Sequence, residues 1–117
     1  VNIGRMGHLV ETMLIDVMHA YADQDPHKAL KVWRQDVEVD HMHTSFYKEV
    51  LASMSRDSDQ VVSGVHLLFI AKNIEGMGDH VTSIAEQVVF VVTGEMPTEK
   101  RDKADNTSVS LELSKDL

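Results

Sequence analysis

The sequence predicts an all-α protein: an antiparallel three-helix bundle followed by a flexible polar C-terminal tail. Apolar residues recur at helical spacing through three long segments, and no turn signal breaks the third segment into strands. The two prolines fall only near segment boundaries, at positions 26 and 97. With 117 residues, 43% of them hydrophobic, the chain can form one core but not two. We therefore expect a single bundle over residues 1–94 and a polar, disordered tail over residues 95–117.

The first predicted helix precedes Pro26. Its apolar residues recur at alternating steps of three and four, which is the spacing of one helical face. This seam consists of Ile3, Met6, Val10, Met13, Val17 and Ala20. Further apolar residues broaden the seam, so we expect this helix to contact more than one neighbour. These residues are Leu9, Leu14, Ile15 and Met18.

The second predicted helix begins at Asp25 and Pro26, because Asp is a favoured N-cap and Pro suits the first helical position. It covers about residues 26–54. The third helix covers about residues 59–93 and ends at Gly94, which is a typical C-cap. Long helices joined by short loops pack as antiparallel neighbours, which gives the three-helix bundle.

The tail over residues 95–117 consists largely of Glu, Lys, Asp, Thr and Ser, a composition typical of a solvated segment. Residues 109–113 alternate between apolar and polar, so this stretch could instead pair as an edge strand.

The charge balance excludes several classes of function. The chain has 11 basic and 19 acidic residues, a formal net charge of −8, and no cysteine. An acidic chain without a basic patch repels phosphate backbones, so we expect no nucleic-acid binding. No apolar run approaches the ~20 residues that span a bilayer, and the N-terminus does not read as a signal peptide. We therefore expect a cytoplasmic protein without membrane insertion, whose partners are cations or basic surfaces.

Two pairs of acidic residues interrupt the apolar pattern, and the first lies on the second helix. Asp36 and Asp40 are four residues apart and therefore share one helical face. Asp36 falls within an apolar stripe and Asp40 lies beside it. Burial of like charges on such a stripe is costly unless something compensates them. The stripe contains Val32, Trp33, Val39, Phe46, Val50 and Leu51.

The second pair, Glu75 and Asp79, repeats this spacing on the third helix. The stripe that we expect to face the core of this helix contains Ile70, Ile74, Met77, Val81, Ile84 and Val88. Glu75 and Asp79 point away from that stripe. The two pairs therefore need not meet across the core, and a groove or a flank where the two helices run side by side suits them better.

Four carboxylates on neighbouring helices favour a hard or borderline cation, because a bound cation neutralises their repulsion. The alternative is an acidic face that is solvated or paired with lysines. A carboxylate-bridged redox site needs Glu-x-x-His on two helices, and this chain has that motif only at Glu38 and His41. A ferritin-like site is therefore disfavoured. Among the seven histidines, His80 is the best candidate for a functional role because it follows Asp79 directly.

A specific motif lies on the third helix. It consists of Asn73 and Glu75, then Gly78, Asp79 and His80, then Ile84, Ala85 and Glu86. This pattern resembles the signature helix of the PhoU family of phosphate-uptake regulators, and Asp36-x-x-x-Asp40 matches the acidic motif of the preceding helix. The resemblance spans about residues 3–94. It departs from the family at Gly76, where arginine is usual, and at Ser83, where asparagine is common.

The resemblance implies one of two three-helix repeats, by position the C-terminal one. It also implies a metal ion cluster of iron or zinc, with Mg, Mn and Ca as alternatives. The implied ligands are Asp36, Asp40, Glu75 and Asp79. Accessory roles would fall to His80, Asn73 and Glu86.

The resemblance further implies a non-enzymatic, cytoplasmic regulator of phosphate uptake and of the phosphate-starvation response. Such a protein acts between a phosphate ABC transporter, through its ATPase subunit, and a sensor histidine kinase, here by presenting a metal-binding acidic face. The alternative is a metal-free helical adaptor whose acidic surface binds basic partners. A metallo-oxidase or hydrolase is disfavoured, because there is no second Glu-x-x-His and no nucleophile motif. The broad seam of the first helix predicts a homo-oligomer.

Overall fold

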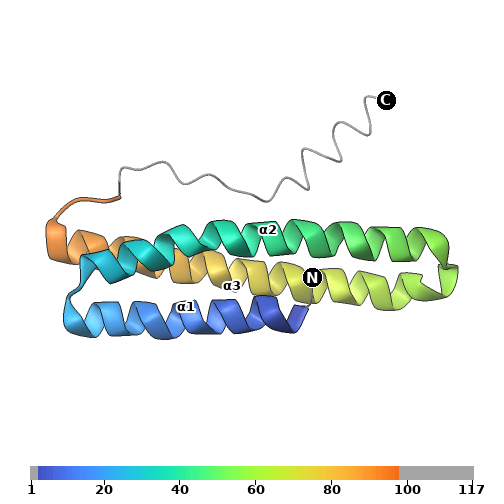
Figure 1. Ribbon diagram of the computed structural model, residues 1–117, viewed down its shortest axis with the longest axis horizontal. Coiled ribbons are helices and arrows are strands. Elements are labelled where there is room, and N and C mark those ends of the chain that lie inside the picture. The colour runs from blue at the N-terminus through green and yellow to red at the C-terminus, as the bar shows by residue number, and fades with distance from the viewer. Residues whose placement is uncertain (1–2, 98–117) are drawn as a thin grey trace, which may run out of the picture.

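Three antiparallel helices lie side by side in the computed structural model, which describes residues 3–97 (Figure 1). The helices are α1 (Ile3–Asp23), α2 (Pro26–Arg56) and α3 (Val61–Thr93), and the short 3-10 turn η1 (Ser58–Gln60) joins the last two. α2 and α3 extend well beyond the N-terminus of α1, so their connected ends form a two-helix hairpin (Figure 1). The predicted three-helix bundle is confirmed. The predicted tail, with the stretch 109–113, lies almost entirely outside the described residues.

The predicted helix ends are confirmed by their caps. The Asp25 carboxylate accepts hydrogen bonds from the backbone N–H groups of His27 and Lys28, at 3.0 and 3.1 Å, and Pro26 follows at the first helical position. At the same end of the bundle, Gly94 has a φ of 78° and its N–H donates to the Phe90 carbonyl. Glycine adopts this left-handed conformation without steric cost, so it ends α3.

The seam of α1 faces the core as predicted. Its buried residues are Met6, Val10, Met13, Val17 and Ala20. The residues expected to broaden the seam divide into two groups. Leu9 packs partly buried against the core, whereas Leu14, Ile15 and Met18 are exposed. The second apolar side of α1 therefore lies on the surface of the bundle.

The predicted core stripe of α3 is wrong for three of its six residues. Ile70, Met77 and Ile84 are 48%, 56% and 37% exposed, whereas Val81 and Val88 are buried and Ile74 is partly buried. The buried seam is rotated by about one residue, or roughly 100°. Its buried members are Gly64, Ala71, Glu75, Gly78, Thr82, Ala85 and Val89.

Small residues explain this rotation of α3. Glycine or alanine occurs at every seventh position of the buried seam, at 64, 71, 78 and 85. A Cβ atom added at Gly64 would lie 2.6 Å from the side chain of Met54 on α2, so the two helices approach closely there. Close packing of α3 on α2 turns the larger apolar side chains of α3 outward. Within residues 3–97, no helix is long and apolar enough to cross a membrane.

Candidate metal centre

Asp36 and Asp40 lie one helical turn apart on α2, and both are completely buried. The spacing of four residues places both carboxylates on the face of α2 that packs in the bundle. Val32 and Val39, also fully buried, lie on the same face. The predicted position of Asp36 within the apolar stripe is confirmed. Asp40 is buried as deeply, and not only beside the stripe.

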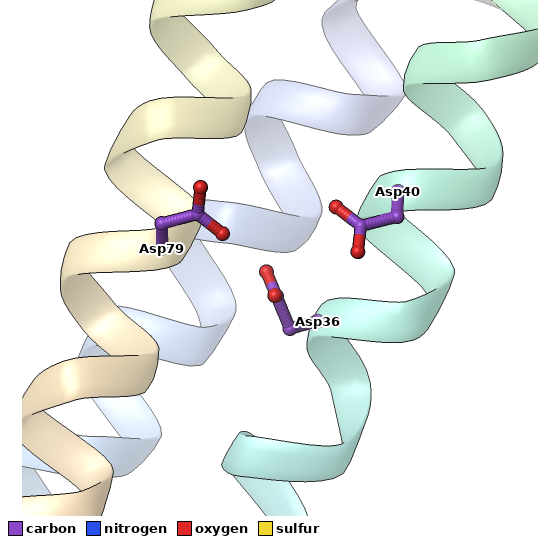
Figure 2. Close-up of side chains that lie close together, drawn as sticks. All are labelled: Asp36, Asp40 and Asp79. Carbon is purple, nitrogen blue, oxygen red and sulfur yellow. The ribbon is translucent and has the colours of Figure 1, made fainter. Parts of the chain in front are cut away.

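Asp79 reaches this pair from α3. One carboxylate oxygen from each of Asp36, Asp40 and Asp79 lies within 4.8 Å of the others. Figure 2 shows the Asp79 side chain projecting from α3 toward the two aspartates of α2. Asp79 is half-buried, so the cluster borders on solvent at its α3 side. Asp79 therefore meets Asp36 and Asp40 where α2 and α3 run side by side, which is the placement that the sequence favoured, although α3 is rotated relative to the predicted stripe.

Glu75 is buried one turn from Asp79 but lies outside this cluster of three aspartates. Its Oε1 accepts a hydrogen bond from Lys72 Nζ at 3.2 Å, and the two groups form an ion pair. The Lys72 side chain is 63% exposed. The structure thus brings together three of the four predicted ligands and gives the fourth a lysine neighbour.

The predicted accessory residues occupy three different surroundings. Asn73 is exposed on α3. His80 is also exposed and lines a groove between α1 and α3 together with Leu14 and Met77. Glu86 is half-buried and accepts a hydrogen bond from Trp33 Nε1 at 3.0 Å, which links α3 to α2.

The aspartate cluster fits a hard cation. Carboxylate oxygens are the preferred ligands of Mg²⁺ and Ca²⁺, and they also serve Mn²⁺, iron and zinc. One carboxylate oxygen from each of Asp36, Asp40 and Asp79 lies within 4.8 Å of the others, so the three side chains are close enough to converge on a single ion.

Comparison with known proteins gives a family match. Residues 3–88 match the PhoU domain family. The chain belongs to that family. No solved structure gives a significant match.

Several curated relatives are named phosphate-specific transport system accessory protein PhoU homolog. The homolog of Caulobacter vibrioides is 44% identical over 104 residues, which cover 89% of this chain and 45% of the relative. That of Zymomonas mobilis is 46% identical over 99 residues, or 84% of this chain and 42% of the relative. That of Rhizobium meliloti is 41% identical over 104 residues, which cover 86% of this chain and 44% of the relative. The chain thus spans less than half the length of these relatives, whose names describe accessory proteins and not enzymes.

In this PhoU domain, two glycines of α3 differ in their surroundings. A Cβ at Gly78 would lie 3.4 Å from Asp36 Oδ1 and 3.5 Å from Val39, which is ordinary van der Waals contact. A Cβ at Gly76 would have no neighbour within 4 Å. The side chain of the arginine that is usual at position 76 would project into open space.

One buried histidine was not selected by the sequence reasoning. His43 is 3% exposed and lies one turn beyond Asp40, with its ring tilted against Tyr47 at 6.3 Å between centroids. Asp36, Asp40 and His43 occupy positions i, i+4 and i+7 of α2, so helical spacing alone would have placed His43 on the same face. Among the histidines, the sequence pattern favoured His80 instead.

Proposed function

We propose that this chain is a non-enzymatic, cytoplasmic regulator of phosphate uptake and of the phosphate-starvation response. It would act between a phosphate ABC transporter, at its ATPase subunit, and a sensor histidine kinase. Membership of the PhoU domain family supports this proposal, as do relatives named for phosphate-specific transport. The working part of the molecule would be a metal-binding acidic face.

The convergence of three aspartates from two helices carries the metal-binding part of the proposal. Like charges within a few ångströms of each other disfavour ionisation and destabilise the fold, most strongly where the groups are buried. Asp36 and Asp40 are fully buried, and Asp79 lies within 4.8 Å of both. A bound cation would convert this repulsion into attraction and would link α2 to α3.

Glu75 would complete the site. It lies one turn from Asp79 on α3 and is paired with Lys72, whose charge sits at the surface. A cation at the cluster would compete with the Lys72 ammonium for the Glu75 carboxylate. The proposed ligands are therefore Asp36, Asp40, Glu75 and Asp79, with iron or zinc as the expected metal and Mg, Mn or Ca as alternatives.

Elemental analysis of the purified, tag-free chain after dialysis tests this part of the proposal. The unsubstituted chain should retain stoichiometric metal, and the double variant Asp36→Ala/Asp79→Ala should retain none. Glu38→Ala/Asp59→Ala is the matched control, because it removes two acids that are exposed. If all three proteins lack metal, the proposal of a metal-binding face is wrong.

A metal-free adaptor is the second candidate, and the net charge of −8 favours it. An adaptor that binds basic partners through bare carboxylates should lose affinity steeply as ionic strength rises, and chelators should not affect it. A metal-dependent face should lose binding in chelator. Binding to the transporter ATPase subunit or to the kinase, measured with and without EDTA across a salt series, separates the two candidates.

A further inference from the structure

Two histidines of α2 lie two residues apart but in opposite surroundings. His41 is exposed, whereas His43 is only 3% exposed. All seven histidines of the chain fall within residues 3–97, and His43 is the one among them that is buried. A polar ring in the interior costs free energy unless polar groups accompany it there. The surroundings of His43 therefore bear on what it does.

His43 belongs to the face of α2 that carries the two buried aspartates. Asp36, Asp40 and His43 follow one another at steps of four and three residues, so they leave the helix within an arc of about 60°. Asp40 and His43 have the spacing of carboxylate and imidazole in the Glu-x-x-His motif, with which helical bundles hold metals in their cores. Glu38 and His41 have the same spacing but are exposed. The buried pair is thus the one that faces the interior.

α3 places Glu75 at the same level along the bundle. A Cβ at Gly78 would lie 3.5 Å from Val39 of α2. Because α2 and α3 are antiparallel (Figure 1), three residues back from Gly78 on α3 corresponds to three residues forward from Val39 on α2. Glu75, which is 3% exposed, therefore lies level with the segment between Asp40 and His43. The interior at this level holds two carboxylates and one imidazole.

We propose that His43 is a nitrogen ligand of the metal, beside Asp40 and Glu75, and that it makes the site selective for zinc or iron over Mg²⁺ and Ca²⁺. This inference rests on the proposed metal-binding face, whose other ligands are all carboxylates. Imidazole nitrogen suits zinc and iron, whereas Mg²⁺ and Ca²⁺ take oxygen ligands. One nitrogen donor among carboxylates therefore favours the first group of metals.

Binding through His43 requires a change of its side-chain rotamer. His43 lies outside the cluster of three aspartates, and its ring is tilted against Tyr47, one turn further along α2. A histidine side chain turns about two bonds between staggered positions, so the ring can swing from Tyr47 toward Asp40 while the helix stays in place. The metal would thus draw His43 from an aromatic contact into the acidic centre.

X-ray absorption of the zinc-loaded chain tests the nitrogen ligand, because an imidazole ligand gives a characteristic multiple-scattering signal. The signal should appear in the unsubstituted chain and in His41→Gln, the matched control from the exposed side of α2. His43→Gln should lack it. Zinc bound without this signal in the unsubstituted chain, or a signal that persists in His43→Gln, would overturn the inference and leave the metal-binding face standing. An unsubstituted chain that binds no zinc would overturn both.

Calorimetric titration with Zn²⁺ and Mg²⁺ tests the selectivity and also covers a variant that binds too little zinc for spectroscopy. His43→Gln should weaken zinc binding about ten-fold or more and change Mg²⁺ binding less than two-fold, with unchanged helical circular dichroism. His43→Asp, which replaces the nitrogen donor with an oxygen donor, should shift the preference toward Mg²⁺. Equal losses for both metals in His43→Gln would indicate a purely structural role, and that result or an unchanged zinc affinity would overturn the inference.

Discussion

The inner and outer sides of α3 differ in a way that reverses the usual distribution of residues. The inner side packs against α2 and carries Glu75, which is buried, and Asp79, which is half-buried. The outer side carries Met77 and Ile84, which are exposed and have no charged neighbour on their side of the helix. Charged residues are normally excluded from the core, and contiguous apolar surface is normally covered. Both departures occur on one helix.

Each side of α3 is suited to a different kind of contact. Carboxylates that converge from two helices suit a cation. An uncharged apolar surface suits a second apolar surface. The four predictions below test this contrast, from the largest expected effect to the smallest.

Metal binding to the inner side should have the largest effect on stability. A ligand at one hundred times its Kd adds about 2.7 kcal/mol, which raises the Tm of a domain of this size by roughly 10–20 °C. Thermal melts of chelator-treated protein, with and without added metal, measure this shift. Glu38→Gln should keep the metal-induced rise in Tm, because Glu38 is exposed. Asp40→Asn should lose this rise. An undiminished shift in Asp40→Asn would place the ion elsewhere.

Two apolar residues one turn apart on α3 test which side faces the core. Val81 is 4% exposed and Met77 is 56% exposed. Val81→Ala should lower the free energy of unfolding by about 2 kcal/mol through lost burial and a cavity, and Met77→Ala should change it by less than about 0.5 kcal/mol. Urea denaturation at low protein concentration checks both values. If Met77→Ala lowered the free energy of unfolding more than Val81→Ala, the stripe predicted from the sequence would be the one that faces the core.

Removing one charge from the aspartate cluster should stabilise the metal-free chain. Asp36→Asn keeps the size of the side chain and removes one of three neighbouring negative charges, so we expect a gain of about 1 kcal/mol. Urea denaturation in chelator measures it, with Glu38→Gln expected to change stability by less than about 0.5 kcal/mol. A loss of stability in Asp36→Asn would show that the charge is already compensated within the bundle.

The two glycines of α3 should give the smallest effects. Gly76→Ala should stabilise the helix by about 1 kcal/mol, because alanine favours helix and the added methyl meets nothing. Gly78→Ala should gain less stability and should weaken metal binding, because the added methyl group would lie 3.4 Å from Asp36 Oδ1. Urea denaturation and metal titration of both variants test this difference. Equal behaviour would mean that Gly78 leaves no space that the cluster needs.

Much of the fold was predictable because the relevant signals are local. Asp25, Pro26 and Gly94 mark helix ends through the hydrogen bonds and backbone angles that they alone favour. The seam of α1 was predictable because its apolar residues follow a single helical face. At the candidate site, the fully buried position of Asp36 followed from its place in the stripe of α2.

The orientation of α3 was decided only by the tertiary structure. This helix is apolar around most of its circumference, so its periodicity allows two parallel seams that differ by one residue. The seam with the larger side chains is exposed, and the seam with the smaller side chains faces the core. Gly64 lets α2 approach closely along the other seam, and the packing gained there outweighs the exposure of Met77 and Ile84. The sequence by itself determined three helices and two acidic pairs. The meeting of Asp79 with Asp36 and Asp40 depended on close helix packing, which arises only when two surfaces are brought together.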